Sequence, residues 1–352
     1  MPGGQLLLPR VFGLCRGVKR ALAMLDAAVT EHQGRGARLF LLGEIIHNPW
    51  VNAFFEARGV RSLTRNQHAD LEAIITGDDC AIIPAFGVPL PVERRLRAIG
   101  CEIVDTSCGD VRRLWRWAEQ AAGEGYGVVI FGRANHDETV VTKSRLAEAG
   151  GRYVVVGNIE QTRQLCDLIG SGDEKSVFAT MFDASTTNAE SLRPFERIAQ
   201  VSQTTMLYDD TREVRRLLRD SLCRRFGEDE GAGRLLFEPT VCRATQDRQA
   251  AALELCRSGL DLAIVVGGFG SSNTHHLYEL ARECVPAWFI EDAQAIGDEG
   301  EILAMGPASG SPAVMTDWLP KRRPLRIGVL AGASSPDVVV GGVLERLAQL
   351  LS

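Results

Sequence analysis

A local pattern that occurs three times constrains this chain most: an apolar run ends at a cysteine, and a segment with helical periodicity follows directly. The pattern surrounds Cys15 in VFGLCRGVKRALAML, Cys108 in CEIVDTSCGDVRRLWRWAEQ and Cys242 in LLFEPTVCRATQDRQAALEL. A thiol at a helix N-terminus is held as thiolate by the partial positive charge of that end. Because thiolate is the form that binds a metal, we predict that these three residues, the ligand cysteines, converge on one iron–sulfur cluster.

Burial is the alternative for every cysteine, since a free cysteine commonly behaves as a small buried hydrophobe. For the ligand cysteines both interpretations stay open at this point. No two cysteines are separated by two residues, so zinc-ribbon and ferredoxin spacings are absent. Burial is our prediction for the other six cysteines, which are Cys80, Cys101, Cys166, Cys223, Cys256 and Cys284.

The apolar runs and helical patterns alternate along all 352 residues, as in α/β proteins. The run at 260–266 is almost continuously apolar, which indicates a parallel sheet covered on both faces. Polar motifs follow the carboxyl ends of such strands, where parallel sheets bind ligands. We expect irregular chain at 227–233 and an inserted loop at 305–323. The predicted strands are 5–8, 38–42, 80–84, 102–105, 128–132, 153–156, 197–201, 260–266, 287–290 and 325–330.

The three cysteine-led blocks suggest an internal repeat of α/β units. We place the first unit at 14–108, the second at 109–241 and the third at 242–352 together with 1–13. A length of this order is typical of two or three domains.

Composition excludes several classes of function. The net charge of -6 argues against a nucleic-acid partner. No apolar run approaches the ~20 residues that a membrane span needs, so we expect no membrane partner. The start, MPGGQLLLPR, lacks the charged and apolar regions of a secretory signal, and the nine cysteines do not suggest a disulfide framework. We therefore expect a cytoplasmic protein.

Eight segments match a known family in order along nearly the whole chain. They are FGLCRGVKRA, GEIIHN, DTSC, NHDE, SQTT, CRATQDRQ, GSSN and AGASSPD. With these segments the chain resembles the 4-hydroxy-3-methylbut-2-enyl diphosphate reductases, the LytB-type iron–sulfur reductases of the methylerythritol phosphate pathway of isoprenoid biosynthesis. The resemblance implies three similar α/β units with mostly parallel sheets, arranged pseudo-threefold around a central 4Fe–4S cluster that has three cysteine ligands and one open iron.

The resemblance also implies an oxidoreductase that carries out a reductive dehydroxylation. The allylic oxygen of the substrate binds the open iron, and two electrons and two protons remove it as water. The products are isopentenyl and dimethylallyl diphosphate. Lewis-acid polarisation makes hydroxide a feasible leaving group, and a carboxylic acid must supply protons. Ferredoxin or flavodoxin is the electron donor that the family implies.

Residue by residue, the ligand cysteines match the cluster ligands of the family. Glu138 matches the glutamate that delivers protons, Thr204 the threonine that arranges the substrate hydroxyl, and His136 a histidine of the same site. Without the family motifs, Glu138 reads simply as a negative charge in the first turn of a helix. The diphosphate pocket is implied at His47, His136, Ser271, Ser272, Asn273 and Ser334.

Simpler interpretations of the pocket residues stand beside this one. His47 alone could be a turn histidine, and the run at 271–273 a helix cap. Ser334, which comes shortly before Pro336, could likewise be part of a helix cap. The joint pattern favours a site, because neutral donors and helix N-termini suit a phosphate group.

Three positions depart from the family and belong to our predicted substrate-binding set. Phe86 stands where the family has a histidine that contacts the diphosphate, while Arg133 and Arg243 stand where it has other residues. One interpretation is that Arg133 or Arg243 replaces the lost histidine, since guanidinium binds phosphate through two donors at once. The other is a divergent paralogue that reduces a different substrate, with Phe86 packed against an apolar group. A cluster sensor without enzymatic activity is a third hypothesis, against which the presence of Glu138 and Thr204 speaks.

Overall fold

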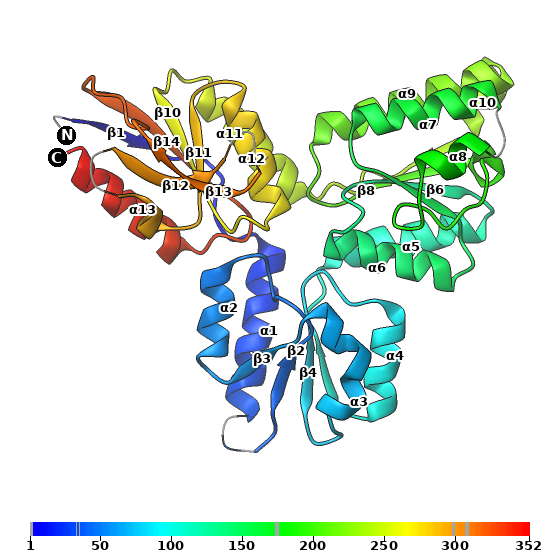
Figure 1. Cartoon of the computed structure of the whole chain (residues 1–352), viewed down its shortest axis with the longest axis horizontal. Helices are drawn as coiled ribbons and strands as arrows, with labels where there is room; N and C mark the ends of the chain where they lie inside the picture. Colours follow the sequence, from blue (N-terminus) through cyan, green and yellow to red (C-terminus); the bar gives the residue numbers. More distant parts are fainter. Residues whose placement is uncertain (1–2, 33, 35, 173–175, 298–299, 307–309) are drawn as a thin grey trace. The chain divides into compact units, whose positions relative to one another are not determined.

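The computed structural model describes residues 3–32, 34, 36–172, 176–297, 300–306 and 310–352. It shows an α/β protein with three four-stranded sheets and one two-stranded sheet (Figure 1). The strand orders are β1-β14-β10-β11, β3-β2-β4-β5 and β7-β6-β8-β9, with β12-β13 as the pair. The α/β class and the parallel sheets predicted from the sequence are confirmed.

The fourteen strands of the described chain are β1 (Gly4–Leu7), β2 (Leu39–Leu41), β3 (Val60–Ser62), β4 (Cys80–Ile83), β5 (Glu102–Asp105), β6 (Gly127–Phe131), β7 (Tyr153–Val156), β8 (Ile198–Ser202), β9 (Leu235–Phe237), β10 (Leu262–Val266), β11 (Ala287–Ile290), β12 (Glu301–Met305), β13 (Pro312–Thr316) and β14 (Leu325–Ala331). The α-helices are α1 (Arg16–His32), α2 (Pro49–Glu56), α3 (Leu71–Ile74), α4 (Leu90–Ile99), α5 (Gly109–Gly123), α6 (Asp137–Glu148), α7 (Ile159–Ser171), α8 (Ser176–Met181), α9 (Tyr208–Phe226), α10 (Glu228–Gly233), α11 (Arg243–Cys256), α12 (Ser272–Arg282) and α13 (Asp337–Leu350). The 3₁₀ turns are η1 (Arg65–Asp70), η2 (Arg193–Glu196) and η3 (Ala293–Ala295).

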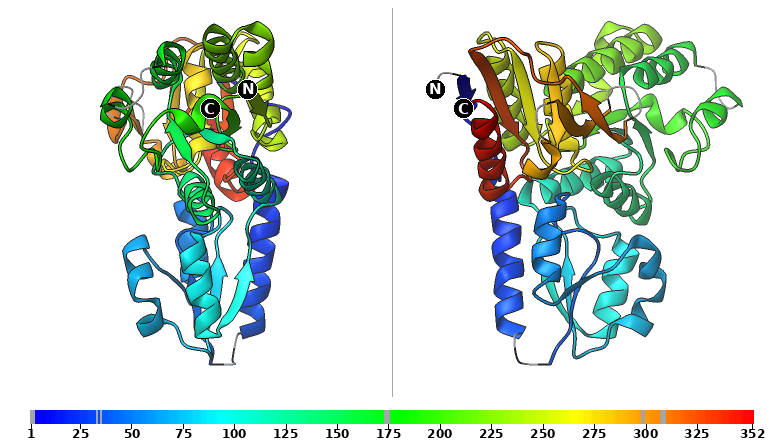
Figure 2. Two further views of the ribbon diagram at one scale, coloured as in Figure 1. Left: turned by 90° about the vertical axis from the view of Figure 1, so that its right-hand side faces the viewer. Right: turned by 60° about the vertical axis from the view of Figure 1, so that its left-hand side comes forward.

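The chain divides into two compact units, which are described separately. Unit 1 comprises 1–35, 44–62 and 243–352, and its sheet pairs β1, β14, β10 and β11 in parallel. Strand β10 is buried on both faces, as its apolar run predicts: Leu262, Ile264 and Val266 pack with α13, while Ala263 and Val265 pack with α11 and α12. Figure 2 shows β1 beside β14, so the first and last strands of the chain are neighbours.

Unit 2 comprises 36–43 and 63–242. In it β2, β4 and β5 pair in parallel, as do β7, β6, β8 and β9. Successive side chains of β6 likewise pack on opposite faces of the sheet. Val129 and Phe131 pack with α7 and α9, whereas Val128 and Ile130 pack with α5 and α6. The polar motifs therefore follow the carboxyl ends of strands whose positions are fixed by burial on both faces.

The ten predicted strands are confirmed to within two residues at each end, and the structure adds β3, β9, β12 and β13. Two predictions of irregular chain are wrong. Residues 228–233 form α10, because the acidic first turn stabilises the helix N-terminus. Residues 312–316 form β13, which pairs antiparallel with β12; of the predicted loop, 307–309 lie outside the described residues. The division into three units at 14–108, 109–241 and 242–352 with 1–13 stays a prediction. Among the described residues no helix is both long and apolar enough to span a bilayer.

Candidate functional site

Glu138 and Thr204 form a buried pair in unit 2. Glu138 lies in the first turn of α6 and is 2% exposed, while Thr204 follows the end of β8 and is 5% exposed. The backbone N–H of Thr204 donates to Glu138 Oε1, and its hydroxyl donates to Oε2, each over 2.6 Å. Both carboxyl oxygens are thus held in one orientation by a single residue of the turn after β8.

Burial determines the protonation of Glu138. Desolvation raises the pKa of this carboxyl from 4.5 to about 7, although the hydrogen bonds from Thr204 act in the opposite direction. The negative charge of Asp110 raises it further. A carboxyl with a pKa near neutrality can both hold and release a proton at physiological pH, which a general acid requires.

Cys242 lies directly beside this pair. Its backbone N–H donates to the carbonyl oxygen of Thr204 over 3.0 Å. The segment before it is fixed to the end of β8, because Thr240 exchanges two hydrogen bonds with the backbone of Ser202 (2.6 and 2.7 Å). The predicted ligand and the predicted proton donor are therefore neighbours in unit 2.

Phe86 and His136 meet in the same unit. Their ring centroids are 6.0 Å apart in an edge-to-face arrangement. His136 caps α6, and its Nδ1 accepts a hydrogen bond from the backbone of Glu138 over 3.2 Å, so a neutral His136 carries its proton on Nε2. Cys108 is the N-cap residue of α5, and its N–H donates to the carbonyl of Ala85, next to Phe86 (2.9 Å).

Cys15 occupies the predicted position at a helix start in unit 1. It immediately precedes α1, and the backbone N–H of Val18 donates to its Sγ over 3.4 Å. An N–H group of the first helical turn is thus aimed at the sulfur atom. The backbone N–H of Cys15 donates to the carbonyl of Ala333 over 3.1 Å, which joins this loop to the end of β14.

The predicted phosphate donors gather close to Cys15 in unit 1. The Ser334 hydroxyl donates to Ser271 Oγ over 3.1 Å, and both residues are buried. The Asn273 Oδ1 accepts from the Ala333 N–H over 2.9 Å. Ser271 is also the N-cap of α12, in which Ser272 is the first residue, so the cap interpretation is confirmed without excluding a ligand role.

His47 lies against the loop that precedes α12. A Cβ on Gly268 would stand 2.5 Å from the His47 carbonyl oxygen, so glycine is needed for this close approach. The side chain of His47 pairs through Nδ1 with Glu44 Oε2 at 2.8 Å. Each unit thus brings part of the predicted set together: Cys15, His47, Ser271, Ser272, Asn273 and Ser334 in unit 1, and Phe86, Cys108, His136, Glu138, Thr204 and Cys242 in unit 2. Convergence of the three ligand cysteines stays a prediction.

The two unusual arginines are both exposed. The backbone N–H of Arg133 donates to Gln203 Oε1 over 3.1 Å, while the side chain of Arg243 is 83% exposed and pairs with Asp247 at 2.8 Å. A role for either in replacing the missing histidine stays a prediction.

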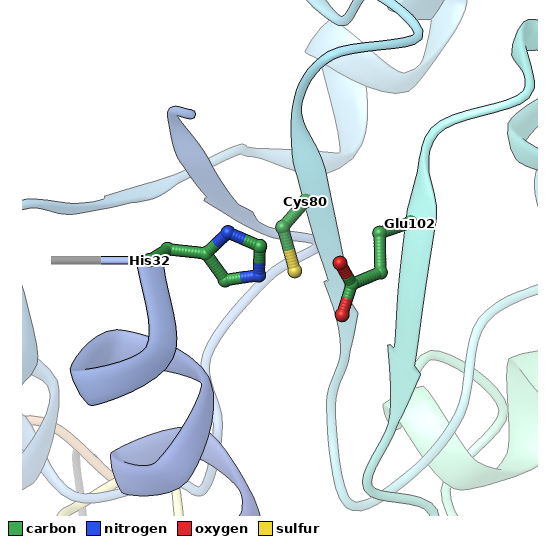
Figure 3. Close-up of side chains that lie close together, drawn as sticks. All are labelled: His32, Cys80 and Glu102. Carbon is green, nitrogen blue, oxygen red and sulfur yellow. The ribbon is translucent and has the colours of Figure 1, made fainter. Parts of the chain in front are cut away.

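The remaining cysteines separate into two kinds. Burial is confirmed for Cys80, Cys101, Cys166 and Cys256. Burial raises the thiol pKa of Cys166 and Cys256 to about 11. Cys80 lies in β4, where it is paired with Glu102 of the neighbouring strand β5 (Figure 3). The prediction is wrong for Cys223, which is half-buried, and for Cys284, which is exposed, because both lie near helix ends rather than under a sheet. The ligand cysteines, half-buried at helix starts, fit a metal-binding role better than the core thiols do.

Sequence reasoning missed the buried polar residues of α11, two of which contact segments of the predicted site. Thr245 is 1% exposed and its Oγ1 accepts from Asn273 Nδ2 over 3.3 Å. Arg248 is 5% exposed and donates to the carbonyl of Gly13, in the Cys15 loop. Both belong to the CRATQDRQ segment, and their spacing of three places them on one helix face. That spacing was the signal available in the sequence.

Comparison with known proteins identifies the family of this chain. Residues 6–348 match the family described as LytB protein. The 4-hydroxy-3-methylbut-2-enyl diphosphate reductase of Thermosynechococcus vestitus is 36% identical over 348 residues, which cover 98% of this chain and 84% of the relative. The reductase of the same name from Gloeobacter violaceus is 35% identical over 355 residues, covering 99% and 83%.

Two solved structures are similar over the whole chain. One is a 4-hydroxy-3-methylbut-2-enyl diphosphate reductase described as the terminal enzyme of the non-mevalonate pathway, with 26% identity, a TM-score of 0.59 and coverage of 99% of this chain and 100% of that one. The reductase of Plasmodium falciparum has a TM-score of 0.72 at 20% identity, with coverage of 99% and 89%, and supports the fold alone. From the family match and the full-length relatives, the chain belongs to the LytB family of 4-hydroxy-3-methylbut-2-enyl diphosphate reductases.

Proposed function

We propose that this protein is an iron–sulfur oxidoreductase that converts 4-hydroxy-3-methylbut-2-enyl diphosphate into isopentenyl and dimethylallyl diphosphate. The observation that carries the proposal is the buried Glu138–Thr204 pair, because its carboxyl has a pKa of about 7 and can deliver a proton to a departing hydroxyl group. The family match and the name of the full-length relatives support the same reaction.

Cys15, Cys108 and Cys242 would hold a 4Fe–4S cluster. Each lies at the start of a helix, and none is fully buried. When bound, the cluster supplies electrons and Lewis acidity for loss of the hydroxyl group. We propose a ferredoxin or flavodoxin as the external source of those electrons.

The protein contributes the proton for the leaving group and the orientation of the substrate. Glu138 transfers its proton to the leaving hydroxyl group, and Thr204 then stabilises the resulting carboxylate through its N–H and O–H. Because the backbone of Cys242 is bonded to Thr204, the proton donor keeps a fixed place relative to one predicted ligand.

The diphosphate would bind to the neutral donors of unit 1. Ser271 and Ser272 stand at the N-terminus of α12, where the helix dipole favours an anion. The Ser334 hydroxyl already contacts Ser271, so both can turn towards one phosphate group. His47 lies beside the same loop and can add a ring N–H donor.

Turnover of the diphosphate by protein with a reconstituted cluster tests the proposal. The protein is purified without oxygen, its iron and sulfide are measured, and reduction is examined by EPR before the assay with a strong artificial reductant. Absence of iron, sulfide and an EPR signal would contradict a cluster protein. A Glu138→Gln variant that supports full activity in cells would instead favour a sensor without enzymatic activity.

A second candidate keeps the cluster and changes the substrate. The observation that favours it is the edge-to-face contact of Phe86 with His136, which puts an apolar ring where the family has a donor. This candidate predicts slow turnover of the usual diphosphate. Fast turnover with the wild-type Phe86 would refute it.

A further inference from the structure

Arg248 is a buried cation in the middle of α11. Only 5% of it is exposed, and its guanidinium reaches a backbone segment 235 residues earlier in the sequence. Nε and Nη2 both donate to the carbonyl oxygen of Gly13, over 3.2 and 2.6 Å, and Nη1 donates to the carbonyl of Ala244 over 2.9 Å. Burial of a guanidinium is unfavourable unless its donors are satisfied, so these bonds hold the side chain in one geometry.

The acceptor belongs to the loop that presents Cys15. Gly13 has a φ of +69°, which other residues rarely adopt, and a Cβ there would stand 3.1 Å from Asp337 Oδ1. Two residues later, the Cys15 N–H donates to Ala333. The loop is therefore fixed on one side by α11 and on the other by the segment that follows β14, and it lies close to the start of α13.

We propose that Arg248 is a positioning residue that fixes the Cys15 loop and stabilises the negative charge of the cluster bound there. The inference rests on the proposed function, because it requires Cys15 to be a cluster ligand. Three thiolates give such a cluster a net negative charge, and the electron added on reduction increases this charge by one unit. A cation held near the ligand loop favours the reduced state, so it raises the reduction potential.

The connection between two ligand segments makes the role specific. Helix α11 begins at Arg243, directly after Cys242, and Arg248 lies in its second turn. One side chain therefore ties the helix that follows Cys242 to the loop that precedes Cys15. A flexible cation cannot replace it fully, since a lysine ammonium lacks the planar fork that bonds two carbonyls at once.

The test compares Arg248→Met and Arg248→Lys with wild type and with a matched control. Arg257→Met alters an exposed arginine just after the end of the same helix. Hydrogen–deuterium exchange of the segment 11–18 is measured in the cluster-free protein. The iron content, the rate of iron loss to a chelator and the midpoint potential are measured in the reconstituted protein.

We expect Arg248→Met to speed exchange in the segment 11–18 roughly tenfold, as for loss of a hydrogen bond from a charged donor. It should also lose iron faster and shift the midpoint potential to a more negative value. Arg248→Lys lacks the planar fork, so hydrogen exchange of the segment 11–18 should also rise in this variant. Because it keeps the positive charge, its midpoint potential should stay nearer that of wild type. Arg257→Met should match wild type in every measurement.

Exchange and midpoint potential in Arg248→Met equal to those of Arg257→Met would overturn the inference. If Arg248→Met does not fold, unchanged exchange in the segment 11–18 of Arg248→Lys would overturn it equally. A wild-type protein that binds no iron or sulfide would refute the proposed function, whereas the exchange comparison would still decide whether Arg248 fixes the loop.

Discussion

Replacement of Glu138 by glutamine should change how the stability of the protein depends on pH. Glutamine has nearly the same shape as a protonated glutamate but cannot ionise. The Thr204 N–H can still donate to the amide oxygen, and the amide group can donate to the Thr204 hydroxyl. The variant therefore removes the ionisation while it keeps the packing.

The magnitude follows from the shift of the carboxyl pKa. The folded value of about 7 is above the ordinary value of 4.5. Between these values the folded state binds more protons than the unfolded state, so the free energy of unfolding of the wild type falls as pH rises and levels off above pH 7. A difference of this size corresponds to about 3 kcal/mol, at 1.36 kcal/mol for each pKa unit. The variant lacks this loss, so it should gain about 3 kcal/mol relative to wild type between pH 4.5 and pH 8.

Urea unfolding of the cluster-free protein measures this difference at several pH values from 4.5 to 8. Glu124→Gln is a suitable control, because Glu124 is an exposed carboxylate of the same unit. A stability difference between wild type and Glu138→Gln that stays constant over this range would refute the raised pKa. In turnover assays the same variant should lose roughly a hundredfold or more in kcat, as for removal of a general acid.

Three further predictions concern the ligands, the pocket and the Cys15 loop. Serine in place of any one ligand cysteine should abolish cluster binding. Cys166→Ser should retain the cluster, because that thiol is buried with a pKa of about 11. Equal iron content in all four variants would contradict the assignment of the ligands. Phe86→His should lower KM for the diphosphate about tenfold by adding one donor worth about 1.4 kcal/mol, with little change in kcat; no gain would indicate that the phosphate is bound without that contact. Gly13→Ala should destabilise the protein by about 1–2 kcal/mol from backbone strain. The loss should exceed that of Gly34→Ala, since of these two glycines only Gly13 has an atom within 3.1 Å of the added Cβ. Urea unfolding of both variants measures the difference in stability between them.

Sequence periodicity was sufficient to predict most of the fold. A run such as 260–266 has no polar face, so only a strand covered on both sides can accommodate it, and β10 lies there. The hairpin of β12 and β13 was missed because it lies at the edge of the core: Val314 is 62% exposed, and the stretch carries Pro and Gly that resemble a loop. The helix α10 was missed because it is short and contains two glycines.

The sequence by itself determined which residues are available for chemistry. The strand–cysteine–helix pattern identified Cys15, Cys108 and Cys242, since the helix N-terminus that favours thiolate is a local feature of the chain. The motifs likewise identified Glu138 and Thr204 as candidates. These inferences needed no knowledge of contacts between distant segments.

Only the tertiary structure decided what those residues can do. The pKa of Glu138 depends on desolvation by the surrounding core and on two hydrogen bonds from a residue 66 positions away. The role of Arg248 depends on a contact across 235 positions. Burial and long-range hydrogen bonds arise when separate segments pack together, so no local pattern encodes them, and they set the charge and the position of each group that the sequence supplies.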